Sequence, residues 1–312
     1  MNTRLHSVRI AAAVACMLAG ARIAAAGPIL YTFGADGSSI PASLSSMDPT
    51  SPASVANLVA SLGADNIGFN GGVVYTGGLL YAVGNDSGGN ATIYSFNTLG
   101  QNLTATSSDF NTTGDASGYV FQNGLAAIGS SLYAIGAGPS DEDLFEIGNG
   151  SATLISALNT YNGTYAGLAY DQSTGEFYGV IANAASGSNT GDLLVEFGLS
   201  GNVSVVANLT SLDGADPNTH LGGLADAGGG ILYAIYTNTG DGNGELEQIL
   251  LNGSPQTTAL YDTNIPLAQN AGIAITPAPT SSVPEPTLGA AVLLACGFMF
   301  RMSRRRSARS RG

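Results

Sequence analysis

The segment Leu132-Tyr133-Ala134-Ile135 decides the fold, because near-copies of it recur about every fifty residues. Each copy has an apolar residue, a tyrosine, a small residue and another apolar residue. The tyrosines of the five copies are Tyr31, Tyr81, Tyr133, Tyr178 and Tyr233. A repeat of this length is typical of architectures that stack one supersecondary unit on the next.

Each copy is flanked by further short apolar runs. About ten residues upstream, a glycine precedes one such run, and downstream lie alternating runs such as Ala152–Leu158. Gly, Asn, Asp and Ser separate the runs, which is the pattern of strands joined by turns. We therefore predict four strands in each unit, called A to D in chain order. The glycines before the A runs are Gly72, Gly124, Gly167, Gly223 and Gly272.

Four strands in about fifty residues, repeated five times, predict an all-β, five-bladed β-propeller at residues 27–276. The chain of this domain starts with a B strand at Ile29–Gly34, and the missing A strand is Gly272–Thr276. We expect these terminal strands to pair and close the ring, which leaves no long unpaired edge. A β-sandwich or a β-solenoid is the alternative. The repeat resembles that of secreted bacterial propellers of the NHL and YVTN kind, which implies a fold and no function.

Residues 1–26 have the pattern of a signal peptide. Arg4 and Arg9 precede an apolar run at 10–20, and Ala24-Ala25-Ala26 forms a cleavage motif of the A-x-A type. We predict cleavage after Ala26, with Ala24 and Ala26 as the recognised residues. Cys16 makes a lipoprotein an alternative, but Ala13 stands where a lipobox prefers leucine.

Residues 283–312 have three parts and follow a Pro/Ser/Thr linker at 277–282. They are a Pro-Glu-Pro motif, an expected transmembrane helix at 287–303 and a basic, cytoplasmic end at 304–312. The apolar run at 287–300 would be about 21 Å long as a helix, short of the ~30 Å hydrocarbon core. The residues that carry the pattern are Pro284, Glu285, Pro286, Arg304, Arg305 and Arg306.

This tail resembles the PEP-CTERM sorting signal of Gram-negative and related bacteria. The resemblance covers about the last thirty residues. It implies recognition by a membrane-embedded exosortase, removal of the tail, and release or attachment of the body at the cell surface or in the extracellular matrix. The protein would then touch the membrane only through the C-terminal helix before processing. An ordinary tail anchor is the alternative.

The charges exclude several functions of the body. All nine basic residues lie near the two ends, so residues 27–283 contain no Lys or Arg but 21 of the 22 acids. A body without Lys has no P-loop lysine or Schiff base, and one without Arg has no bidentate phosphate clamp. Nucleic acid would be repelled. Cys16 and Cys296 lie in the end segments, so the body has no disulfide and no cysteine nucleophile.

Most acids of the body are expected on one face of the ring. In a blade, the D–A and B–C connections share one face, and the A–B and C–D connections share the other. The first face is expected to carry Asp36, Asp86, Asp141, Glu142, Asp143, Asp192, Asp241 and Glu245 in B–C loops, and Asp65, Asp109, Asp115, Asp213, Asp216 and Asp262 in D–A loops.

The opposite face is expected to carry fewer acids: Asp48, Asp171, Glu176 and Asp226. Three further acids, Glu146, Glu196 and Glu247, lie in C strands and are expected to point to solvent. An acidic face would attract cations, although Asp is also an ordinary turn residue. Asp241, Asn243 and Glu245 place oxygen side chains at alternate positions, so we predict them as Ca²⁺ ligands. Ca²⁺ is the one cofactor that the sequence suggests.

The expected function is non-catalytic: an exported cell-surface or matrix protein that adheres to or binds extracellular polysaccharide. Tyr119, Tyr161 and Tyr165, expected in D–A loops, are candidates for stacking on sugars, or else hydrophobic plugs of long loops. The alternative is a carbohydrate-active hydrolase with paired carboxylates on the acidic face. We assign no catalytic residue. His220 is the body's one histidine, which excludes a multi-histidine zinc site, and no Gly-x-Ser-x-Gly elbow accompanies it.

Overall fold

The computed structural model describes residues 28–34, 43–49, 57–61, 68–85, 90–122, 124–139, 142–158, 161–186, 189–209, 219–238, 243–258, 261–266 and 272–277. Gly27–Ala278 form one compact unit. The predicted signal peptide, linker residues 278–282 and sorting tail lie outside the described residues, and so do all their site residues. Among the described residues, no helix is long and apolar enough to cross a membrane.

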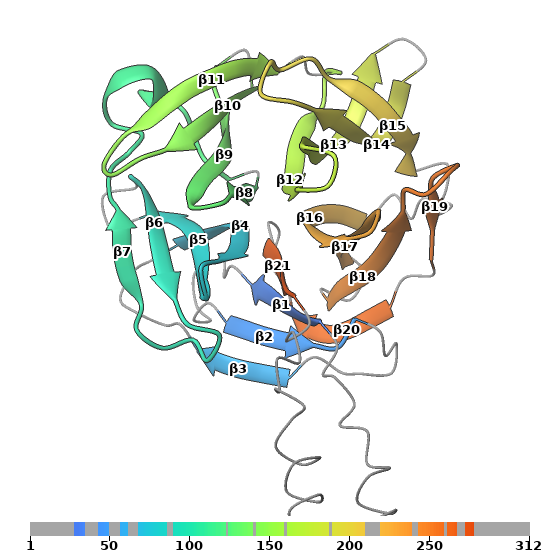
Figure 1. Cartoon of the computed structure of the whole chain (residues 1–312), viewed down its shortest axis with the longest axis horizontal. Helices are drawn as coiled ribbons and strands as arrows, with labels where there is room; N and C mark the ends of the chain where they lie inside the picture. The colour runs from blue at the N-terminus through green and yellow to red at the C-terminus, as the bar shows by residue number, and fades with distance from the viewer. Residues whose placement is uncertain are drawn as a thin grey trace, which may run out of the picture. The chain divides into compact units, whose positions relative to one another are not determined.

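The described part of the unit consists of five antiparallel sheets, four of four strands and one of five. The sheets are arranged around an axis (Figure 1). The second sheet contains β4 (Gly68–Thr76), β5 (Leu79–Asn85), β6 (Ala91–Phe96) and β7 (Thr104–Ser107). The third contains β8 (Leu125–Ile128), β9 (Ser131–Ala137), β10 (Glu142–Ile147) and β11 (Ala152–Leu158). The fourth contains β12 (Thr164–Asp171), β13 (Glu176–Ser186), β14 (Asn189–Phe197) and β15 (Ser204–Asn208). The prediction of a five-bladed propeller is confirmed, and the sandwich and solenoid alternatives are wrong.

The first sheet combines strands from both ends of the unit. It consists of β21 (Gly272–Thr276), β1 (Ile29–Gly34), β2 (Ser43–Met47) and β3 (Asn57–Ser61). In the antiparallel pair of β1 and β21, Tyr31 lies opposite Ala274 and Thr32 opposite Ile273. β21 also contacts β16 and β4, the inner strands of the sheets on either side.

The fifth sheet departs from the four-strand pattern at its outer edge. It contains β16 (Thr219–Gly228), β17 (Ile231–Asn238), β18 (Asn243–Leu250) and the two-residue β19 (Gln256–Thr257). A further strand, β20 (Tyr261–Pro266), pairs with the other part of β18 and places Asp262 opposite Glu245. Asp262 therefore lies in a strand, and its predicted position in a D–A loop is wrong. The short β19 follows Pro255, which has no N–H to donate to a longer pairing.

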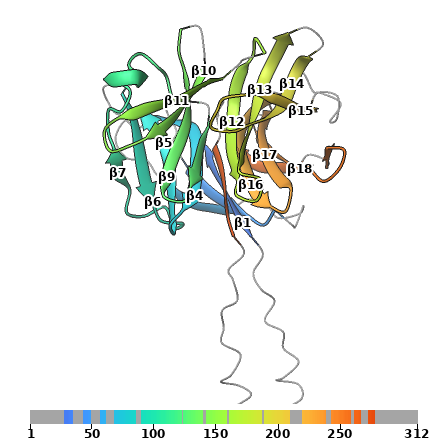
Figure 2. The same cartoon turned by 45° about the horizontal axis from the view of Figure 1, so that its top comes forward.

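The core lies between neighbouring sheets, which stack face to face around the axis (Figure 2). Successive side chains of an inner strand point to opposite neighbours, because side chains alternate along a strand. Leu125 of β8 packs with the second sheet, whereas Ala126 packs with the fourth. The tyrosines of the repeated phrase also belong to this core: Tyr31, Tyr133, Tyr178 and Tyr233 are buried. Burial of one such side chain stabilises the fold by roughly 1.5–3 kcal/mol.

The glycines before the A runs allow the inner strands to touch. A Cβ at Gly124 would lie 2.6 Å from both the backbone nitrogen and the Cβ of Leu168. A Cβ at Gly72 would lie 2.9 Å from the carbonyl carbon of Gly124. At Gly167 it would lie 2.9 Å from the nitrogen of Leu224. Backbone therefore packs on backbone from β4 through β8 and β12 to β16, which explains why glycine recurs here.

Candidate functional site: the axial cavity

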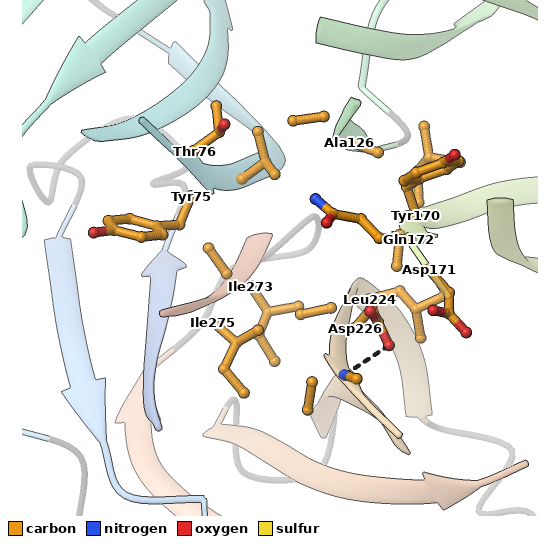
Figure 3. Close-up of a pocket in the computed structure, with 18 of the residues that line it drawn as sticks. Tyr75, Thr76, Ala126, Tyr170, Asp171, Gln172, Leu224, Asp226, Ile273 and Ile275 are labelled. Atoms are coloured by element: carbon orange, nitrogen blue, oxygen red, sulfur yellow. Dashed lines mark hydrogen bonds between the residues drawn. The ribbon is translucent and has the colours of Figure 1, made fainter. Parts of the chain in front are cut away.

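A cavity of about 720 Å³ lies on the axis of the ring (Figure 3). All five inner strands, which are the A strands nearest the axis, contribute to its wall. In each of them the lining residues begin one residue after the repeated glycine and continue toward the A–B turn. The lining residues are 73–76, 125–127, 168–173, 224–228 and 273–277, together with Pro28. The cavity is therefore built from the most strongly repeated part of the sequence.

The wall presents backbone polar groups as well as side chains. Each of β4, β8, β12, β16 and β21 forms a ladder with only one neighbour in its sheet. The other edge of each strand faces the axis, and no described strand pairs with its N–H and C=O groups there. Such groups need partners from water or from a ligand. The cavity can therefore both donate and accept hydrogen bonds along its length.

A tight turn after β12 shapes one end of the cavity. Oδ1 of Asp171 accepts hydrogen bonds from the backbone N–H and the hydroxyl of Ser173, both at 2.7 Å. Gly175, at φ +79°, donates its N–H to the Asp171 carbonyl oxygen at 2.9 Å. Asp side chains commonly stabilise turns in this way. The turn holds Gln172 exposed, and its side chain extends into the middle of the cavity (Figure 3).

Asp226 lies at the same end of the neighbouring inner strand, β16. Its Oδ1 accepts the N–H of Gly228 at 3.0 Å (dashed in Figure 3). Burial raises the pKa of Asp226 above its ordinary value, and the negative charge of Asp171 raises it further. The Gly228 N–H acts in the opposite direction. The cavity thus contains two carboxyl groups, those of Asp171 and Asp226, on the A–B face.

The aromatic residues of the cavity are partly occupied by the fold. The ring of Tyr75 points away from the cavity in Figure 3 and packs against the core between the first and second sheets. The ring of Tyr170 lies 5.0 Å from that of Phe177. Thr76 donates its hydroxyl to the Gly129 carbonyl oxygen at 2.8 Å, which joins two neighbouring A–B turns. Gln172 is therefore the side chain that is most available to a ligand.

Several acids predicted in B–C loops lie in C strands instead. Asp192 lies in β14 and Glu245 in β18, while Glu142 and Asp143 open β10 and are buried. The oxygens of Glu142 accept the backbone N–H of Tyr165, in the next sheet, at 3.0 and 3.3 Å. Asp143 accepts the Tyr119 hydroxyl at 2.5 Å. These hydrogen bonds explain how carboxyl groups are accommodated without a basic residue, and the prediction that all four residues lie in loops is wrong.

The other expected acids divide into three groups. Asp109 and Asp115 lie between β7 and β8, and Asp48, Asp171, Glu176 and Asp226 lie on the opposite face, as predicted. Glu247 is fully buried in β18, so its predicted exposure is wrong. The remaining acids of the predicted face lie outside the described residues: Asp36, Asp65, Asp86, Asp141, Asp213, Asp216 and Asp241.

The tyrosines proposed to stack on sugars serve the core. Tyr165 lies within β12, is fully buried, and packs against Phe197 with ring centroids 6.0 Å apart. Tyr119 packs on Phe145 at 4.9 Å, and Tyr161 packs against the core between the third and fourth sheets. The loop position predicted for Tyr165 is wrong, and the alternative of hydrophobic plugs in long loops fits Tyr119 and Tyr161.

The calcium prediction stays open. Asn243 and Glu245 lie in β18, whereas Asp241 lies outside the described residues. Within the described ranges, no group of three or more His, Cys, Asp or Glu side chains is placed to hold a metal ion. His220 lies in β16. Sequence reasoning missed Gln172 as a site residue, although its position after Asp171 at the end of an A run was a usable signal.

Comparisons with known proteins place the fold but no family. No protein-family profile matches the sequence, and no curated protein matches it. A solved structure described as an exo-β-1,3-galactanase of Bifidobacterium bifidum has 9% identity and a TM-score of 0.50, over 76% of this chain and 91% of its own. The six-bladed Aleuria aurantia lectin, which recognises fucose, has 16% identity and a TM-score of 0.47, over 75% and 74%. A chain of a nidogen–laminin complex has 13% identity and a TM-score of 0.43, over 80% and 98%.

The five sheets around one axis define the class of protein: a β-propeller. The neighbours are propellers of various kinds, and at this level of identity they show the fold alone.

Proposed function

We propose that this protein is a non-catalytic binding propeller that holds an uncharged, hydroxyl-rich ligand, such as an extracellular polysaccharide, in its axial cavity. The observation that supports this best is the cavity itself. It combines the open edges of five strands with a projecting amide, that of Gln172. Amides and backbone groups suit hydroxyl groups, because both partners donate and accept.

The charge of the body supports a neutral ligand over an anionic one. Residues 27–283 carry 21 acids and no Lys or Arg, and two of the acids, Asp171 and Asp226, line the cavity. A sulfated or uronate-rich polymer would meet only negative charge there, which costs binding free energy. Neutral glycans meet no such penalty.

A blocking variant tests this proposal. Ala227 lines the cavity and is exposed, so Ala227→Trp should fill the mouth without disturbing the core. The control is Ser117→Trp, at an exposed position between β7 and β8, where no cavity residue lies. On a panel of neutral and acidic glycans, the body should retain neutral glycans only, and Ala227→Trp alone should lose them. Equal binding by the two tryptophan variants would refute the cavity as the site.

A second candidate function is glycoside hydrolysis at the same cavity. Asp226, with its raised pKa, has the property of a general acid, and the neighbouring Asp171 could serve as the carboxylate partner. Both groups also stabilise their own turns, which is a structural role. Release of new reducing ends from neutral oligosaccharides, lost in Asp226→Asn, would favour the hydrolase. Intact oligosaccharides after prolonged incubation favour simple binding.

Export and processing are proposed from the sequence. The signal peptide would direct the body across the inner membrane, and cleavage after Ala26 would release it. An exosortase would then act on the tail that contains Pro284, Glu285, Pro286, Arg304, Arg305 and Arg306. Mass spectrometry of the mature protein should find Gly27 or a nearby residue as the first and should not find residues 301–312. Retention of those residues on most mature molecules would defeat the sorting proposal.

We also propose that the pairing of β1 with β21 holds the ring closed. Removal of residues 272–276 would expose one edge of β1 and take away the strand between β16 and β4. The shortened body should unfold at a lower urea concentration with reduced cooperativity, as measured by circular dichroism. The same loss should not follow from truncation after Pro277. Unchanged cooperativity in the shortened body would show that the ring does not depend on the pairing of β1 with β21.

A further inference from the structure

We propose that the axial cavity takes the end of a glycan chain, one or two sugar units long, rather than a stretch within the chain. We further propose that Gln172 is the residue that recognises this end. This inference deepens the proposed function and rests on it. It concerns the mode of binding, which the proposed function leaves open.

The inner end of the cavity is where the inner strands come closest. In every inner strand, the residues that line the cavity begin one residue after the repeated glycine. The glycines themselves therefore do not line the cavity. At this level the backbones touch: a Cβ at Gly124 would lie 2.6 Å from Leu168, and one at Gly72 would lie 2.9 Å from Gly124. Contact between neighbouring strands closes the wall of the cavity. Because each of the five inner strands contacts the next around the axis, only a narrow opening remains on the axis at this level. A polymer chain that enters from the A–B face therefore meets a narrowing at the glycines.

The size of the cavity sets the length of the segment that fits. A volume of about 720 Å³ lies within the ~300–1,000 Å³ range of pockets that enclose a compact small-molecule ligand. A mono- or disaccharide is a ligand of this kind, whereas a long chain is not. An internal stretch would require a second exit or an open groove, and the wall of the cavity is instead formed by strands on all five sides.

Gln172 is placed to contact such an end. The turn that carries it is fixed by the Asp171–Ser173 hydrogen bonds and the Gly175 N–H, so its backbone is preorganised. Its side chain reaches into the cavity in Figure 3. Among the described residues, none forms a hydrogen bond with its amide group. A terminal sugar could satisfy the amide nitrogen and oxygen together, since vicinal hydroxyls both donate and accept.

The test compares the affinity of the body for neutral β-linked gluco- and galacto-oligosaccharides of one to six units by calorimetry. The affinity should rise from one unit to two and then stay level, because further units lie outside the cavity. Gln172→Ala should weaken binding about tenfold, as expected for loss of a hydrogen bond worth ~1.4 kcal/mol. Gln122→Ala, at an exposed position between β7 and β8, is the matched control and should not change the affinity.

Each other result overturns part of the inference. An affinity that keeps rising up to six units would show binding along the chain and refute end recognition. Normal affinity in Gln172→Ala, together with loss in Ala227→Trp, would place the site in the cavity but remove Gln172 from recognition. If no neutral oligosaccharide binds, the proposed function fails and the inference fails with it. Circular dichroism of each variant separates loss of binding from loss of fold.

Discussion

Asp226 and Asp171 line one cavity from two neighbouring inner strands, where burial raises the pKa of Asp226 and the charge of Asp171 raises it further. No basic residue of the body can neutralise either charge. The larger part of the shift comes from the burial of Asp226 itself. The raised pKa of Asp226 has consequences for the stability of the protein.

Asp226→Asn should make the protein more stable at neutral pH. A carboxyl group whose pKa is raised by folding binds its proton more tightly in the folded state, so its ionised form destabilises the fold at neutral pH. This penalty fades as the pH falls through the raised pKa toward the ordinary value of 3.8. Asn keeps an oxygen for the Gly228 N–H but carries no charge. Urea unfolding should show a gain at pH 7 that disappears in acid.

The control for this substitution is Asp109→Asn. Asp109 is exposed and has φ +56°, a conformation that Asn also tolerates. Its substitution should leave the free energy of unfolding nearly unchanged at both pH values. A gain of equal size in both variants would assign the effect to the net charge of the body rather than to the cavity pair.

Gly124→Ala should destabilise the protein by at least about 3 kcal/mol, because it adds both overpacking and backbone strain. Gly124 has φ +128°, and its new Cβ would meet Leu168 at 2.6 Å. Gly129→Ala is the matched control, since Gly129 also has positive φ, +61°, but has nothing within 4 Å. It should cost only about 1 kcal/mol. Similar losses in urea denaturation would contradict the view that contact between inner strands requires glycine.

Tyr165→Phe should leave the protein as stable as before or more stable. The Tyr165 hydroxyl is buried, and no described residue is within hydrogen-bonding reach of it. Removal of the hydroxyl relieves a desolvation cost of up to roughly 1–3 kcal/mol. Its burial also raises the pKa of Tyr165, so the phenol stays neutral throughout the ordinary pH range.

Tyr119→Phe should have the opposite effect. Its hydroxyl donates to Oδ2 of Asp143, and Oδ1 of Asp143 is buried without a partner among the described residues. Loss of the donor leaves a buried carboxylate with less stabilisation, at a cost of about 1.5–3 kcal/mol. The two phenylalanine variants should therefore shift the urea midpoint in opposite directions. A loss of stability in both would show that the Tyr165 hydroxyl has a partner after all.

Calcium should raise the melting temperature of the body if Asp241, Asn243 and Glu245 bind it, because a ligand that binds only the folded state stabilises it. Asp241→Asn should abolish the shift, whereas Asp115→Asn should not. Magnesium is the comparison ion, since it favours a smaller octahedral site. If neither calcium nor a chelator changes the melting temperature, the prediction of Ca²⁺ binding is refuted.

The sequence predicted the ring but misplaced many of its side chains. The repeated Leu-Tyr phrase and the preceding glycine report backbone requirements, and these repeat in every unit. Glu247 was misjudged because alternation along a strand is a reliable guide to exposure only when one face of the sheet contacts solvent. Glu142 was misjudged because it was placed in a loop before the strand that contains it. In this ring most sheets are covered on both faces, so a carboxyl group in a C strand can be buried. The hydrogen bonds that make this possible join different sheets, as between Glu142 and Tyr165.

The cavity was harder to foresee than the fold. Its polar backbone groups lie at strand edges, and every inner strand has such an edge whatever its sequence. Its distinctive side chain is a single glutamine in a turn. Counting loops placed most acids on the face of the B–C and D–A connections. The two acids that line the cavity, Asp171 and Asp226, lie on the other face, which has fewer acids. Asp171 and Asp226 were correctly assigned to that face. Their proximity, however, depends on the packing of β12 beside β16, which no local pattern reports.

Pro28 and Pro277, the first and last described residues, both line the cavity. Any fusion partner or surface linkage attached close to either end is consequently anchored at the rim of the cavity. A purification tag placed there would compete for space with the proposed ligand, and a short immobilisation linker would hold the opening against the sensor surface. The turns between β7 and β8, which contribute nothing to the cavity, are the better attachment points for labels.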